Sequence, residues 1–203
     1  MFTLQTYTNA ATFLAQTAPL FRSDEVRHGL IYGIAERLRE YPDLFPAAPY
    51  LATVHDSGRL TAAALMTPPH NLLVVATEAE PAAAFTRIAQ NLKADGWELP
   101  GVNGVSAWSH AFATIWQAAT GATPAQQMEL RVFALRQVYP PTNVPGIMRV
   151  ASDADLELVL AWYTDFQLDA HVNDPPPRAE AIQRRIHEQS IFCLLYTSDA
   201  ADE

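Results

Sequence analysis

Asp165, Asp169 and His171 lie close together near the C-terminal end of a predicted helix, with Phe166 among them. Carboxylates attract cations, so this group would favour a cationic amine. Of all the residues that could do chemistry, these four have the strongest claim to a functional interpretation.

Other side chains with possible chemistry favour structural interpretations. His70, in a Pro-Pro turn, could exchange protons near neutral pH. It has no partner nearby in the sequence, and His55, at a strand end, is similar. The spacing of Trp108, His110 and Trp116 is more typical of a helix core than of a ligand cage. No metal-ligand spacing and no G-x-S-x-G nucleophile elbow occurs, so we predict no metal site and no hydrolase.

The elements that would position these residues centre on 59–91. Leu60 to Met66 predicts a strand, TPPHN a turn, and Leu72 to Thr77 a strand buried on both faces, because LLVVAT shows no polar alternation. Glu80-Pro81 opens a helix that Gly96 ends. Its predicted buried residues are Ala84, Phe85, Ile88, Ala89 and Leu92.

The segments before this centre predict an edge strand, two helices and a hairpin. Phe2 to Tyr7 alternates, Asn9 caps one helix and Ser23 the next. Tyr50 to His55 is a strand joined to Leu60 to Met66 through Asp56-Ser57-Gly58. The second helix should bury Val26, Leu30, Ile31, Ile34 and Leu38.

After the centre, a first domain closes and a second begins. Glu98 to Val105 is a short extended segment, Ser106 or Ser109 caps a helix, and Met128 to Val138 alternates as a half-buried strand. We therefore expect a first domain over 1–138 and a linker over 139–146.

The second domain begins with a strand over Ile147 to Ala151, followed by a capping box of Ser152 with Asp155. A further helix over Arg178 to Gln189 and a strand from Ile191 follow. The first helix should bury Leu156, Val159, Leu160, Tyr163 and Phe166.

Composition excludes several classes of protein. The 203 residues carry a net charge of −9 without a basic block, so nothing attracts nucleic acid or an anionic membrane. No apolar run approaches the roughly 20 residues that span a bilayer. The N-terminus lacks a signal-peptide pattern, so we expect a cytoplasmic protein.

The last eleven residues, CLLYTSDAADE, look foreign to the chain. They match, codon by codon, the translation of a transposon-type sequencing adapter. We therefore expect 193–203 to be an artefact with few native-like contacts, and give no weight to its single cysteine, Cys193.

Three stretches, ALMTPPHNLLV, ELPGVNG and FATIWQAATGATPAQQMELRVFAL, resemble the GNAT superfamily of N-acetyltransferases. More narrowly, Phe2 to Phe192 resembles bacterial members with a degenerate first half and a catalytic second half. The resemblance implies an α/β (α+β) fold, with a mixed, mostly antiparallel sheet flanked by helices, then the first strand and helices of a second such unit over 147–192. It also implies acetyl transfer from acetyl-CoA to a primary amine of a small molecule or peptide.

The resemblance places few functional residues in this chain. Members hold the coenzyme pyrophosphate in a Gly-rich loop, Arg/Gln-x-x-Gly-x-Gly/Ala, between the fourth strand and its helix. Thr77 to Ala84 (TEAEPAAA) has no glycine or cation and adds Glu78 and Glu80, so we expect no acetyl-CoA binding here. The catalytic and cofactor-binding residues would lie beyond Phe192. The resemblance also places Asp165, Phe166, Asp169 and His171 by the acceptor amine. A non-catalytic GNAT-like binding module is the alternative.

Overall fold

The computed structural model describes all residues except 44, 46, 78–80, 141, 171–175 and 196–203. It divides into unit 1, Met1–Leu135, and unit 2, Arg136–Glu203. The division falls three residues before the predicted end of the first domain. None of the helices in the described ranges is long and apolar enough to cross a membrane.

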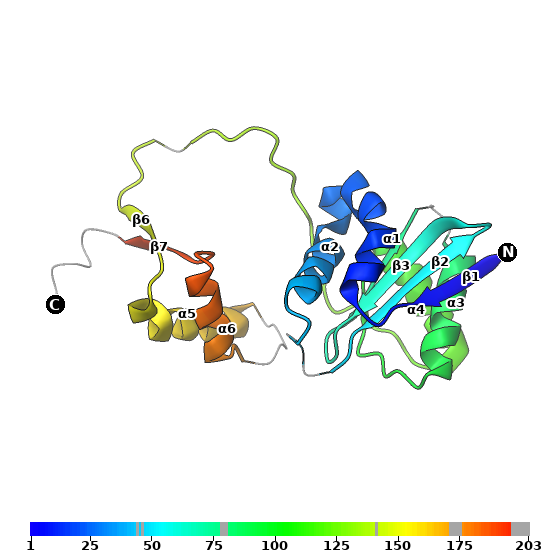
Figure 1. Ribbon diagram of the computed structural model, residues 1–203. Helices are drawn as coiled ribbons and strands as arrows, with labels where there is room; N and C mark the ends of the chain where they lie inside the picture. Colours follow the sequence, from blue (N-terminus) through cyan, green and yellow to red (C-terminus); the bar gives the residue numbers. More distant parts are fainter. Residues whose placement is uncertain (44, 46, 78–80, 141, 171–175, 196–203) are drawn as a thin grey trace. The chain divides into compact units, whose positions relative to one another are not determined.

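A five-stranded sheet forms the centre of unit 1 (Figure 1), in the spatial order β1-β2-β3-β4-β5. Neighbouring strands are antiparallel except β4 and β5, which are parallel. The prediction of a mixed, mostly antiparallel sheet with three adjacent central strands is confirmed. The strands are β1 (Phe2–Thr6), β2 (Tyr50–Asp56), β3 (Arg59–Met66), β4 (Leu72–Ala76) and β5 (Val102–Asn103).

Helices cover both faces of this sheet. Every residue of β4 is buried, as the lack of alternation in LLVVA predicts for a strand covered on both sides. Helix α1 packs on β2 and β3 and against α2, whereas α3 packs on β1 to β3 and against α4. Their bounds are α1 (Ala10–Ser23), α2 (Glu25–Glu40), α3 (Ala82–Ala94) and α4 (Ser106–Thr120).

The core of unit 1 joins these layers through aromatic side chains. Phe85 of α3 and Phe112 of α4 are fully buried, with ring centroids 5.8 Å apart in an edge-to-face arrangement. Phe13 and Phe21 of α1 fill the other side of the sheet, 5.9 Å apart. The predicted buried face of α3 is confirmed: Ala84, Phe85, Ile88, Ala89 and Leu92 are all buried.

The predicted caps are correct for α1 and wrong for α2 and α4. Asn9 accepts the amide of Thr12 at 3.0 Å and begins α1. Ser23 is the last residue of α1 and donates to the Leu20 carbonyl, and Asp24 caps α2 instead. Helix α4 starts at Ser106 without any side-chain cap.

The buried face of α2 is rotated from the predicted one. Val26 and Leu30 are exposed, whereas His28 and Ala35 are buried beside Ile31 and Leu38. The prediction followed hydropathy and passed over His28. Its ring stacks on Trp108 of α4, with centroids 6.1 Å apart.

The predicted strand over Met128 to Val138 is wrong. This segment has no regular secondary structure, and its large apolar side chains are exposed, Phe133 by 87%. A strand requires backbone partners, and β5, at the edge of the sheet, is only two residues long. The alternation indicates which face a strand would bury, but a strand also needs a neighbouring strand to pair with.

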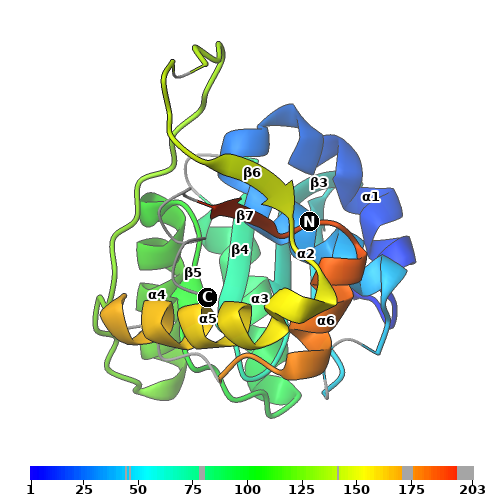
Figure 2. The ribbon, with the colours of Figure 1, turned by 90° about the vertical axis from the view of Figure 1, so that its left-hand side faces the viewer.

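Unit 2 has two helices between two antiparallel strands, as the sequence predicts (Figure 2). Its elements are β6 (Ile147–Val150), the 3₁₀ turn η1 (Asp153–Asp155), α5 (Leu156–Asp169), α6 (Ala179–His187) and β7 (Phe192–Leu195). Its small core consists of Ala151, Val159, Ile182, Ile186 and Cys193.

Two members of the predicted α5 stripe are wrong. Val159 is buried, and Leu156 and Leu160 pack against the core, but Tyr163 is 38% and Phe166 63% exposed. The small core of unit 2 is covered by the first two turns of α5 and leaves the last turn in solvent.

The expectation that 193–203 makes few native-like contacts is wrong for its first three residues. Cys193, Leu194 and Leu195 belong to β7 and pair with Arg149, Met148 and Ile147. The Cys193 side chain is buried, whereas Leu194 and Leu195 are each about two-fifths exposed. Residues 196–203 lie outside the described residues. The adapter origin of the segment stays a prediction.

Candidate functional site

Asp165, Phe166 and Asp169 lie together at the C-terminal end of α5. All three are exposed, and their three- and four-residue spacings place them on one side of the helix. The structure places them together on the exposed surface of the helix. His171, the fourth predicted acceptor residue, lies outside the described residues.

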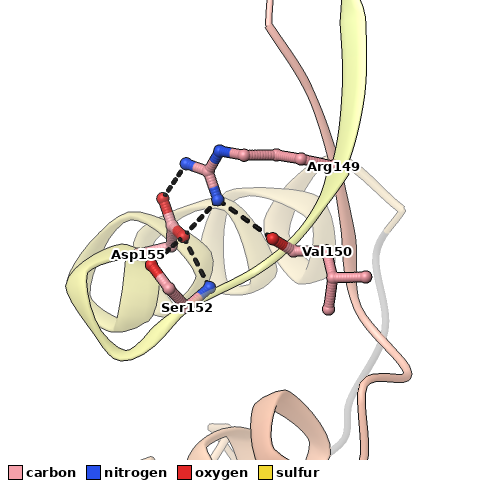
Figure 3. Close-up of polar contacts among 4 residues, drawn as sticks. All are labelled: Arg149, Val150, Ser152 and Asp155. Atoms are coloured by element: carbon pink, nitrogen blue, oxygen red, sulfur yellow. Dashed lines mark hydrogen bonds and ion pairs between the residues drawn. The ribbon is translucent and has the colours of Figure 1, made fainter.

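A second polar cluster lies at the N-terminal end of the same helix, around the buried side chain of Asp155 (Figure 3). Arg149 of β6 donates two parallel hydrogen bonds to the Asp155 carboxylate, each 2.7 Å long. The amide and hydroxyl of Ser152 donate to the same carboxylate at 2.7 and 2.9 Å. The capping box predicted from Ser152 and Asp155 is therefore present, with an arginine that the sequence did not indicate.

This cluster has a structural role rather than a reactive one. The bonds from Arg149, then those from Ser152, hold the pKa of Asp155 well below its usual range. The carboxylate is charged, accepts four donors and is 8% exposed, so it has little capacity left for a ligand. Arg149 also donates to the Val150 carbonyl at 3.1 Å. These hydrogen bonds fix the end of β6 against the start of α5.

The connection between β4 and α3 contains Thr77 to Ala84, the stretch compared above with a pyrophosphate-binding loop. Thr77 is held at its start, because its amide and hydroxyl both donate to the Thr61 carbonyl, at 2.9 and 3.2 Å. Pro81 begins α3 without a side-chain cap and brings no amide hydrogen. Glu78 and Glu80, which the sequence places here, lie outside the described residues.

A surface hollow of about 430 Å³ lies between α1, the start of β3 and Thr77, the residue after β4. Sequence reasoning missed it, because its lining comes from three segments far apart in the chain and no motif marks them. The lining is mostly apolar, with one cation at the rim. The residues are Gln16, Pro19, Leu20, Arg59, Leu60 and Thr77.

Three histidines of unit 1 have structural contacts. The Nδ1 of His28 donates to the Leu20 carbonyl, 3.0 Å away, and its ring stacks on Trp108. His70 lies edge-on to Phe45, with centroids 6.0 Å apart. His110 lies 2.7 Å from the Ser106 carbonyl, one turn earlier. Within the described part of the chain, no three His, Cys, Asp or Glu side chains are grouped to hold a metal ion.

No protein-family model, curated protein or solved structure matches this chain. The support for a function therefore comes from its residues and the geometry above.

Proposed function

We propose that this chain belongs to an N-acetyltransferase of the GNAT type, comprising its degenerate first half and the opening of its catalytic half. The observation that carries the proposal is the sheet of unit 1. Four antiparallel strands are followed by α3 and then by β5, parallel to β4. A mixed, mostly antiparallel sheet flanked by helices is what the resemblance implies, with a connection after the fourth strand where the coenzyme loop belongs.

The proposed reaction moves an acetyl group from acetyl-CoA to a primary amine. The amine first loses a proton and then attacks the thioester carbonyl directly. A carbon-nitrogen bond forms, the carbon-sulfur bond breaks, and the coenzyme leaves as a thiolate that takes up a proton. Neither a metal ion nor an acyl-enzyme is required.

Unit 1 is proposed to have lost this activity. A pyrophosphate site needs free amides and positive charge. In the β4–α3 connection, the Thr77 amide instead already donates to the Thr61 carbonyl, and a proline lies at the helix start. The sequence adds two glutamates in this connection. The working loop of the parent would follow β7, in a part of the gene after Phe192.

Calorimetric titration of the purified chain with acetyl-CoA tests the loss of the coenzyme site. We expect no saturable heat in the micromolar range. A stoichiometric isotherm would mean that Thr77 to Ala84 is a working site.

The parent activity needs a second experiment. The gene would be read past Phe192 and its product assayed for acetyl-CoA-dependent release of free thiol with a panel of primary amines. Thiol release supports the transferase. Absence of both thiol release and coenzyme binding by that longer protein would favour the non-catalytic module.

A further inference from the structure

Asn103 is followed by a glycine, and no other asparagine of the chain is. In an Asn-Gly pair the glycine amide nitrogen can reach the side-chain carbonyl of the asparagine, because glycine has no Cβ to hinder the approach. Asn103 is the last residue of the two-residue strand β5, and Gly104 lies in the bend before α4. Both residues are exposed. Figure 2 shows β5 beside β4, its parallel neighbour.

The Gly104 amide faces away from β4. The Leu72 amide donates to the Gly101 carbonyl at 2.9 Å, and this bond sets the alternation of the parallel ladder. In that alternation the Asn103 amide donates to β4 and its carbonyl accepts from the Val74 amide, so the next amide points to the open edge of the sheet. Among the described residues, neither the Gly104 amide nor the Asn103 side chain has a hydrogen-bond partner.

The other asparagines in the described ranges are held or hindered. Asn9 accepts an amide hydrogen as the cap of α1, and the side chain of Asn91 both accepts and donates a hydrogen bond on α3. Asn71 and Asn143 precede leucine and valine, whose side chains crowd the attacking amide. The sequence and the structure therefore single out one asparagine.

We propose that Asn103 is a site of spontaneous deamidation. The Gly104 nitrogen loses its proton and attacks Cγ of Asn103. The new carbon-nitrogen bond closes a five-membered succinimide, and the side-chain nitrogen leaves as ammonia. Water then adds to one of the two ring carbonyls, and the bond from that carbon to nitrogen breaks. Addition at Cγ gives aspartate, whereas addition at the main-chain carbonyl gives isoaspartate.

Isoaspartate should weaken the pairing of β5 with β4. It routes the main chain through the former side chain, which adds one backbone atom before Gly104 and moves the carbonyl that accepts from Val74. The backbones are so close here that a Cβ on Gly104 would lie 2.7 Å from the Val74 carbonyl oxygen. The glycine that this close approach requires is therefore the same one that makes Asn103 reactive.

Peptide mapping by mass spectrometry of the full chain, aged in mildly alkaline buffer, tests the proposal. We expect Asn103 to convert before the other asparagines, into both aspartate and isoaspartate, which electron-transfer fragmentation distinguishes. The rate should rise with pH, because the attacking nitrogen must lose its proton. The synthetic peptide LPGVNGVSAW gives the rate without the fold. The folded chain should react within about tenfold of this rate, because fraying of so short a strand costs little free energy.

Two variants serve as controls. N103Q keeps the amide on a longer side chain that cannot close a five-membered ring, so position 103 should stay unchanged on ageing. N103D carries the charge of the aspartate product on an ordinary main chain. The isoaspartate fraction, isolated by chromatography, should unfold at a lower urea concentration than N103D, because only isoaspartate alters the backbone. Circular dichroism checks that both variants are folded before ageing.

Three results would overturn the proposal. One is a rate in the folded chain below the expected range, because the fold would then protect Asn103. Another is a second asparagine that reacts as fast as Asn103. The third is an equal urea midpoint for the isoaspartate fraction and N103D, which would exclude the effect on the β4–β5 pairing. None of these results depends on acetyl transfer by the parent.

Discussion

Replacing Gly104 with alanine tests the parallel pairing of β4 and β5, on which the proposed function depends. A Cβ at this position would lie 2.7 Å from the carbonyl oxygen of Val74 and 3.3 Å from its Cγ2. The oxygen belongs to the backbone of β4, so no side-chain rotation relieves the contact. Gly104 does not have a positive φ, and the effect of alanine therefore comes from the clash alone.

The magnitude follows from the displacement that alanine forces. Real Cβ contacts essentially never fall below 3.0 Å, so β5 must move away from β4 by a few tenths of an ångström. Overpacking of this kind destabilises a fold by about 1–3 kcal/mol. For a unit of this size, that corresponds to a melting temperature lower by about 3–12 °C.

Two other glycines serve as controls. Gly33 is exposed in α2, and a methyl group added there would meet nothing within 4 Å, so G33A should stabilise by about 0.5–1 kcal/mol. At Gly101 the close atom is Oδ1 of the Asn71 side chain, which can rotate, so G101A should cost less than G104A. Urea unfolding of the full chain, followed by circular dichroism, gives all three values. A G104A midpoint equal to or above that of the wild type would refute this pairing of β4 with β5.

Three further substitutions test the core and two polar contacts. F85A should destabilise unit 1 by about 3–5 kcal/mol in urea unfolding, because the fully buried ring packs against Phe112. Burial, and then the Asp95 charge, raise the pKa of Tyr50 above its ordinary 10, so stability should fall as the pH rises above 10. Absorbance at 295 nm should show one tyrosine that ionises only on unfolding, and Y50F should remove this behaviour. The pKa of Asp155 is lowered in the folded state, so its charged carboxylate stabilises unit 2 at pH values above the ordinary aspartate pKa of about 3.9. This stabilisation is lost as the pH falls further. The extra protection of the β6 amides from hydrogen exchange, relative to D155N, should therefore shrink between pH 5 and pH 2.

The central strands were predictable because their sequences carry the pattern of their surroundings. LLVVA has no polar alternation, and β4 is buried on both faces. Asp56-Ser57-Gly58 indicated the β2–β3 hairpin, where Ser57 and Gly58 have positive φ. Gly96, also at positive φ, ends α3 as predicted. These signals are local, and no distant contact overrides them.

The errors in buried faces and in the strand predicted over Met128 to Val138 have a common physical cause, since each depended on a distant partner. Hydropathy could not indicate that His28 would be buried against the distant Trp108. The alternation of Met128 to Val138 describes a strand without a neighbour. Phe166 has helical spacing with Val159, yet the core of unit 2 ends before reaching it. The candidate site was predictable only as a group of residues on one helix, because enclosure requires a second element.

The pairing of β6 with β7 does not indicate whether the sequence of β7 evolved to form this pairing. Antiparallel pairing uses backbone donors and acceptors that every residue except proline carries, so an adapter-encoded segment can satisfy an open strand edge. Side chains distinguish the cases better, and of Cys193, Leu194 and Leu195 only the first is buried. The core of unit 2 combines Cys193 with Ala151, Val159, Ile182 and Ile186, and four of these five residues precede the adapter-like segment. The Arg149–Asp155 ion pair, which fixes β6 against the start of α5, also precedes it.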